Sequence, residues 1–210
     1  MAKGFRPVRH LDGTPYNGAT LRCTLPAATG GIFNIGDLVV MTSAGGVRQA
    51  GGAGQAGDTA PLPTIGVAVA GARCLGAIVS FEPLRSDLSA YNRAASTLRT
   101  VNVAVADPTL IFETEVDNVG TTTNIADIGS NFDALMTVGT TASAMLLDSS
   151  SIVQSTAGWS LIGIRADDAN LDTITTGGDL TASSATVRGT IVEVTCAEPQ
   201  LGANQVAVGI

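Results

Sequence analysis

The sequence predicts an all-β protein of small β-barrel or sandwich units, with an extended N-terminal arm and at most one short helix. Charged residues make up only 14% of the 210 residues, whereas an ordinary soluble domain carries about 25%. Hydrophobic residues reach 45%, and 25 glycines accompany many Thr, Ser, Ala and Val. This composition favours short strands and frequent turns over a helical bundle rich in Glu, Lys and Leu. A chain so poor in charge also suits a protein that works within an assembly.

The stretch 98–117 is the one around which we expect the rest of the chain to be organised. Val101, Val103 and Val105 alternate with Thr, Asn and Ala, the period of two that marks a strand with one buried face. Asp107-Pro108 then interrupts the strand, because proline has no amide proton and a fixed φ. A second alternating run places Leu110, Phe112 and Thr114 on one face and Ile111, Glu113 and Glu115 on the other. We predict two strands that pair antiparallel as a hairpin.

Short apolar or alternating runs bounded by turn residues predict further strands on both sides of this hairpin. They lie at 20–25, 32–35, 38–41, 47–50, 64–70, 76–82, 132–138, 143–147, 159–166 and 187–196. Residues 201–210 end in the apolar QVAVGI, so we expect them to be paired as a last strand or held by a neighbouring subunit. Residues 85–95 are the best helix candidate, and the alternative there is an irregular crossover.

We expect three parts along the chain. Residues 1–19 form an extended arm, because they contain two prolines and three glycines and show little periodicity. Residues 20–84 form a small β-barrel-like part, since their short strands have the spacing of a barrel or sandwich. Residues 85–210 form a second β-rich part built on the 98–117 hairpin, or one continuous domain with residues 20–84.

The arm carries apolar residues at spaced positions within a basic segment. Residues 1–22 have a net charge of +3, whereas residues 100–210 have −11 and the whole chain −7. An acidic body disfavours nucleic-acid binding, which needs Lys and Arg to neutralise phosphates. We favour an arm that lies on an acidic protein surface over a nucleic-acid arm, which usually has denser basic runs, or a disordered tail. The anchors expected to enter a partner's groove are Phe5, Val8, Leu11 and Tyr16.

The cysteines and the start of the chain indicate where the protein is made. Cys23, Cys74 and Cys196 lack CxxC spacing, so we interpret them as small buried residues in a reducing compartment. No apolar segment of a signal peptide follows the basic MAKGFRPVRH. No run of about 18 apolar residues is present for a membrane span. We expect assembly in a cytoplasm, with neither membrane nor nucleic acid as partner.

One long segment matches a known pattern. Residues 86–118 read SDLSAYNRAASTLRTVNVAVADPTLIFETEVDN, in which a YxRAAST-like stretch precedes a V-x-V-A-D-D-P-x-x-x-F-E-like stretch. The matching residues are Tyr91, Arg93, Ala94, Ala95, Ser96, Thr97, Val103, Ala104, Asp107, Pro108, Phe112 and Glu113. Together with FRPVRHLDGTPYNGA at 5–19 and GAIVSFEPL at 76–84, this segment resembles the capsid decoration, or cement, proteins of tailed bacteriophages. Ala106 departs from the pattern, which has an acidic residue there.

The resemblance implies a structural role on a virion. Such a protein coats the outer surface of an icosahedral capsid and stabilises its capsomer junctions against the pressure of the packaged DNA. Its partners would be the major capsid protein and further copies of itself, as a dimer or a trimer, with assembly in the host cytoplasm. The residues that we expect at these interfaces are Phe5, Arg6, Val8, Arg9, Leu11, Tyr16, Tyr91 and Arg93.

No pattern for catalysis or metal binding is present. His10 is the only histidine and lies in the arm, where a catalytic triad would not be held rigidly. Asp117, Asp127 and Asp133 lack EF-hand spacing, and the pair Glu113/Glu115 suits a solvated strand face better than a glycosidase site. We therefore predict no enzyme activity, no metal and no cofactor.

The alternative function is a β-sandwich binding module, displayed on a surface, that recognises a glycan or a receptor. Carbohydrate sites usually have aromatic platforms, and this chain offers one Trp and two Tyr. Aromatic residues amount to only 4% of the chain.

Overall fold

The structure is a computed structural model, and it describes residues 4–27, 32–41, 65–67, 74–83, 92–94, 97–117, 127–135, 143, 145–151, 158–165, 191–197 and 199. Within these residues the chain forms β-strands and short 3-10 segments and contains no α-helix, which confirms the predicted all-β class. In chain order the elements are β1 (Arg6–His10), β2 (Leu21–Leu25), β3 (Phe33–Asn34), β4 (Leu38–Met41), β5 (Ile65–Val67), β6 (Gly76–Phe81), β7 (Asn92–Arg93), β8 (Arg99–Val105), β9 (Leu110–Glu115), β10 (Asn131–Phe132), β11 (Ala134–Leu135), β12 (Leu146–Leu147), η3 (Ser149–Ser151), β13 (Trp159–Arg165) and β14 (Ile191–Cys196).

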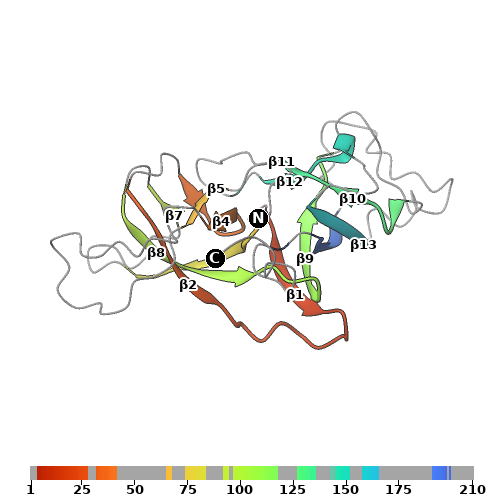
Figure 1. The fold of residues 1–210 in the computed structure, drawn as a ribbon, viewed down its shortest axis with the longest axis horizontal. Helices are drawn as coiled ribbons and strands as arrows, with labels where there is room; N and C mark the ends of the chain where they lie inside the picture. Colours follow the sequence, from red (N-terminus) through yellow and green to blue (C-terminus); the bar gives the residue numbers. More distant parts are fainter. Residues whose placement is uncertain are drawn as a thin grey trace, which may run out of the picture.

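The strands form two five-stranded antiparallel sheets (Figure 1). The first sheet has the order β1-β9-β14-β13-β10, and the second has the order β2-β8-β6-β4-β5. Two short pairs, β11-β12 and β3-β7, complete the described strands. The edge strands β2 and β5 approach each other, so the second sheet curves into a half-barrel. It occupies the left of Figure 1, and β9, β13 and β10 of the first sheet occupy the right.

The predicted hairpin over 98–117 is wrong in its pairing, although both of its strands form. β8 lies between β2 and β6 in the second sheet, whereas β9 lies between β1 and β14 in the first. Asp107 turns the chain between them, because its Oδ1 accepts hydrogen bonds from the Thr109 amide (2.5 Å) and hydroxyl (2.7 Å). Alternation determines which side chains are buried but not which strand lies alongside. Residues 98–117 therefore connect the two sheets.

Each of the other predicted strands that falls within the described residues contains strand structure. The bounds agree at 38–41, whereas the prediction at 132–138 corresponds to two short strands, Asn131–Phe132 and Ala134–Leu135. The segments 47–50 and 201–210 lie outside the described residues. So do residues 85–91 of the predicted helix, and the next two residues are not helical, because Asn92–Arg93 pairs with Phe33–Asn34 as a strand. The expected boundary at residue 85 falls between strands of one sheet. The second sheet combines β2, β4, β5 and β6, which precede residue 85, with β8, which follows it.

The second sheet buries side chains on both of its faces. Val103 of β8 packs inside the half-barrel, whereas the next residue, Ala104, packs in a larger core that contains Phe112 and Trp159 of the first sheet. Neighbouring residues of a strand point to opposite faces, so one sheet forms a wall of two cores. The same switch occurs between Leu38 and Val39 in β4 and between Ala77 and Ile78 in β6.

Glycine is required at the start of β6, beside β8. Gly76 has a φ of +155°, and a Cβ there would lie 1.9 Å from the carbonyl oxygen of Ala104. No side chain fits at that distance, and only glycine adopts this backbone conformation readily. Because Gly76 and Ala104 are small, the two cores can lie close together on opposite faces of one sheet.

A buried polar cluster lies where the N-terminal segment meets the second sheet. The Phe5 amide donates to the carbonyl oxygen of Gly36 (2.9 Å), and the amide of Asn34 donates to Oδ2 of Asp37 (2.8 Å). Asp37 is fully buried. Burial raises the pKa of Asp37, and this outweighs the opposing hydrogen bonds from Ser143 and Asn34. The carboxylate is thus costly to ionise in the folded state.

We predict that Asp37→Asn removes a pH-dependent loss of stability. Because the folded-state pKa is raised, the contribution of protonated Asp37 is complete below its ordinary pKa of 3.8 and is lost as the pH rises through the raised value. The free energy of unfolding of the variant minus that of the wild type should therefore increase with pH above 3.8, by up to about 1.4 kcal/mol per pH unit. Urea denaturation at a series of pH values measures this difference.

Asp12→Asn is the matched control. Hydrogen bonds from Thr14 lower the pKa of the exposed Asp12, so its replacement should change the pH dependence in the opposite direction. A difference for Asp37→Asn that does not vary with pH would contradict the assignment.

Candidate partner-binding surface

The outward face of the first sheet carries a line of charged side chains. Arg6 of β1 lies opposite Glu113 of β9, Glu113 opposite Glu193 of β14, and Glu193 opposite Gly163 of β13. Directly opposed residues of an antiparallel sheet share a face, so these positions form one row across four strands. The neighbouring Phe112 points the other way, into the larger core.

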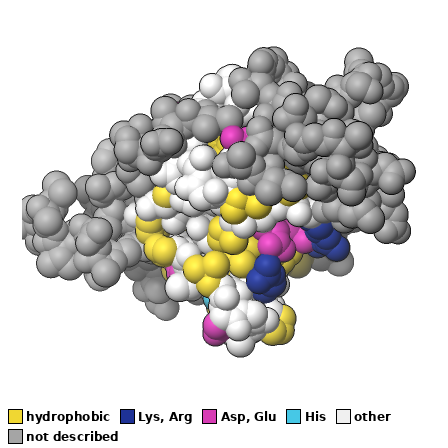
Figure 2. Space-filling model, turned by 90° about the vertical axis from the view of Figure 1, so that its right-hand side faces the viewer, with side chains coloured by type: hydrophobic (Ala, Val, Ile, Leu, Met, Phe, Trp, Pro, Cys, Tyr) yellow, Lys and Arg dark blue, Asp and Glu magenta, His cyan; other side chains and the backbone are white. Residues whose placement is uncertain are grey.

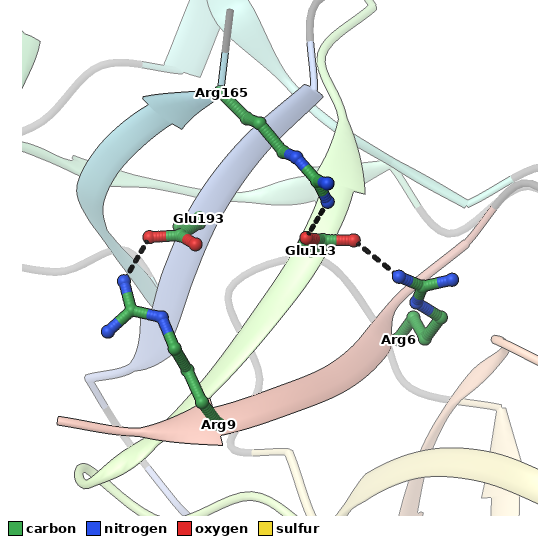
Figure 3. Close-up of polar contacts among 5 residues, drawn as sticks. All are labelled: Arg6, Arg9, Glu113, Arg165 and Glu193. Carbon is green, nitrogen blue, oxygen red and sulfur yellow. Dashed lines mark hydrogen bonds and ion pairs between the residues drawn. The ribbon is translucent and has the colours of Figure 1, made fainter. Parts of the chain in front are cut away.

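Three ion pairs occur here, one within this row and two that connect it to further arginines (Figure 3). Glu113 accepts hydrogen bonds from Arg6 (2.9 Å) and from Arg165, and Glu193 accepts one from Arg9 (2.7 Å). The carboxylates lie beneath the arginines, since the Glu113 side chain is 13% exposed and that of Arg6 is 72% exposed. We call these five residues the arginine–glutamate face.

A β-bulge places both arginines of β1 on this face. Residues three apart in a regular strand point to opposite faces, but the register of β1 shifts between Pro7 and Arg9. Val8 is the extra residue, and Arg9 consequently lies opposite Ile111. Arg6 and Arg9 thereby reach two neighbouring carboxylates from the same side of the sheet.

The arginine–glutamate face has a net charge of +1 in a chain whose net charge is −7. Exposed ion pairs of this kind contribute about 0–1 kcal/mol each to stability, so stability alone is a weak reason for three of them to gather. A guanidinium carries five N–H donors, and each of these contacts uses one arginine nitrogen. The face therefore suits a partner that presents carboxylates. Figure 2 shows basic side chains beside acidic ones here, next to hydrophobic side chains.

The residues that follow β1 fold back on it and form a hairpin. The His10 amide donates to the Thr14 carbonyl oxygen (2.8 Å), and the Tyr16 amide donates to that of Val8 (3.0 Å). The turn is fixed by Asp12, whose Oδ1 accepts from the amide (2.9 Å) and hydroxyl (2.7 Å) of Thr14. We call residues 4–16 the N-terminal hairpin, and its tip presents Leu11, which is 52% exposed.

The structure brings some of the predicted interface residues together and separates others. Arg6, Arg9 and Leu11 lie on the surface of the N-terminal hairpin, and Val8 and Tyr16 are half-buried within it. Phe5 belongs to this hairpin too, but it is buried, with its ring centroid 4.7 Å from that of Trp159.

Arg93 lies apart from the hairpin and is buried inside the chain. Its guanidinium donates to the carbonyl oxygens of Thr97 (2.6 Å) and Pro26 (2.7 Å), and it lies 5.4 Å from the centroid of the Phe33 ring. These contacts tie the β3-β7 pair to the second sheet. The predicted neighbour Tyr91 lies outside the described residues.

The described residues hold no group of three His, Cys, Asp or Glu side chains placed to bind a metal ion. Glu113, half of a carboxylate pair considered from the sequence, is engaged by two arginines. Asp117, considered as a calcium ligand, accepts hydrogen bonds from the amide and hydroxyl of Ser149. In the part of the chain that the structure describes, no helix is long and apolar enough to cross a membrane.

Comparison of the chain with protein-family models, with curated proteins and with solved structures gives no match. The surface is therefore interpreted from its own geometry. Arg165, Glu113 and Glu193 belong to it but were not among the predicted interface residues. The one available signal was the rarity of basic residues in 100–210, where only Arg165 and Arg188 oppose thirteen acids.

We predict that Arg93→Ala lowers the free energy of unfolding by about 3 kcal/mol, because it removes two charge-assisted hydrogen bonds and the packing of a buried guanidinium on the Phe33 ring. Arg6→Ala, at an exposed ion pair, should cost less than about 1 kcal/mol. Urea denaturation of both variants tests this ordering. Equal losses would show that Arg93 does not have the structural role assigned to it.

Proposed function

We propose that this protein decorates the outer surface of an icosahedral phage capsid, where it cements capsomer junctions and associates with further copies of itself. The observation that carries the proposal is the N-terminal hairpin. Its sequence lies within the segment 5–19 that resembles the decoration proteins, and it presents the exposed Leu11 together with two arginines of the arginine–glutamate face. This combination suits contact with a large acidic protein surface such as that of a major capsid protein.

The locations of the other resembling segments support the same proposal. Residues 76–84 contain β6, and residues 86–118 contain β7, β8, the Asp107 turn and β9. These elements connect the two sheets, and Ala106 within them is fully buried. The resemblance therefore involves the framework of the fold, as expected of a structural protein whose family shares an architecture and has no catalytic motif.

The alternative, a glycan-binding module, gains no support from the described aromatic residues. Phe5, Phe33, Phe112, Phe132 and Trp159 are buried to 1% exposure or less. Tyr16 is half-buried and packs against the larger core. No aromatic platform is presented by this part of the chain.

We predict that the double variant Arg6→Glu/Leu11→Ser binds undecorated phage heads at least about tenfold more weakly than the wild type, because it reverses one charge and removes the exposed anchor. Co-sedimentation over a range of protein concentrations measures the affinity. Substitutions are preferable to deletion of residues 1–19, which would also remove Phe5 from the larger core.

Arg22→Glu on the second sheet is the matched control, since Arg22 is also an arginine that pairs with a glutamate, Glu82. It should bind heads like the wild type. Wild-type protein that fails to bind heads at any salt concentration would contradict the proposal. A double variant that binds normally would show that the N-terminal hairpin does not contact the head.

A further inference from the structure

The N-terminal hairpin can leave the first sheet without breaking any other strand pair. Among the described strands, β1 lies at one edge of this sheet and has β9 as its only neighbour there. The remaining order β9-β14-β13-β10 would stay intact after its departure. Among the described strands, β1 is thus a separable unit at the end of the chain.

The residues that hold the N-terminal hairpin in place, which we call its seat, all belong to the rest of the chain, which we call the body. Trp159 receives the ring of Phe5, and the carbonyl oxygen of Gly36 receives the Phe5 amide (2.9 Å). Glu113 and Glu193 receive the two arginines of β1. An empty seat would expose Trp159 and leave both carboxylates with fewer partners, so the seat requires an occupant of this sequence.

The connection between the hairpin and the body, residues 17–20, has the features of a hinge. All four residues are exposed, and the hydrogen bonds there are local: Ala19 donates from its amide to Asn17 (3.0 Å), and its carbonyl accepts from the Tyr16 hydroxyl (2.5 Å). Gly18 has a φ of +81°, and no atom lies within 4 Å of where its Cβ would be. A change of direction here would break no contact with the core.

We propose that the N-terminal hairpin docks on the first sheet of a second copy of this chain, so that neighbouring copies exchange hairpins. Phe5, Arg6 and Arg9 would make the same contacts on the partner copy as they make within one chain. Exchange therefore loses none of these contacts. The balance between the two arrangements is then set by the hinge and by local concentration. A short linker gives a hairpin a millimolar effective concentration at its own sheet. The sheet of a neighbouring copy reaches a similar effective concentration when the copies are held side by side in an array.

This inference rests on the self-association that is part of the proposed function, and mixed cross-linking tests it separately. Arg6→Cys chains are unfolded and refolded together with Glu113→Cys chains, at concentrations from micromolar to millimolar, and then oxidised. Arg6 and Glu113 are directly opposed across β1 and β9, a separation that suits a disulfide. An exchanged hairpin brings the two new cysteines together in register, whereas chains that keep their own hairpins can link only by random collision, and the native cysteines are buried.

The expected result is a covalent dimer of one Arg6→Cys chain with one Glu113→Cys chain, which increases with concentration. A mixture of Ser160→Cys and Thr195→Cys chains is the control, because β13 and β14 both belong to the body and should give no such dimer. If the mixture gives no dimer at any concentration while the double variant Arg6→Cys/Glu113→Cys closes within single chains, exchange is disproved. Binding to phage heads could still persist in that case, so the two proposals fail separately.

Discussion

The fold depends on one constraint: β8 must bury both of its faces at once. Val103 packs in the half-barrel and Ala104 packs against the first sheet, so the chain requires a small residue on one side and a branched one on the other. Gly76 allows β6 to approach the carbonyl of Ala104 from the side. A larger residue at Ala104 would push the two sheets apart. It would thereby disturb the site where the ring of Phe5 packs on Trp159.

The candidate surface follows from this arrangement. Once β8 is fixed in the second sheet, the Asp107 turn directs β9 into the first sheet, where its inward face completes the larger core. The outward face is left for Glu113, and the bulge at Val8 aligns two arginines with it. The same strand thus contributes to folding through Phe112 and to the proposed partner-binding surface through Glu113, and the N-terminal hairpin joins both roles through Phe5 and Arg6.

Sequence periodicity predicted the all-β class, the main strands and the inward-facing side of β9, because these depend on local alternation. It did not predict that β8 and β9 enter different sheets, since alternation carries no information about the neighbouring strand. Burial of Arg93 was missed for a similar reason: its carbonyl partners at Pro26 and Thr97 come together only in the folded chain. The bulge that turns Arg9 outward left no mark in the residue pattern, and Arg165 and Glu193 come from β13 and β14, whose places in the sheet could not be foreseen.

The proposed function requires that this chain bind the outside of a phage capsid through its N-terminal hairpin and the arginine–glutamate face. An electron cryomicroscopy map of undecorated heads incubated with the protein tests it most directly. We expect symmetric extra density on the outer surface, into which the two sheets fit with Leu11 and Arg6 directed at the shell or at a neighbouring copy. Heads that show no added density, or density in which the hairpin points away from every neighbour, would contradict it.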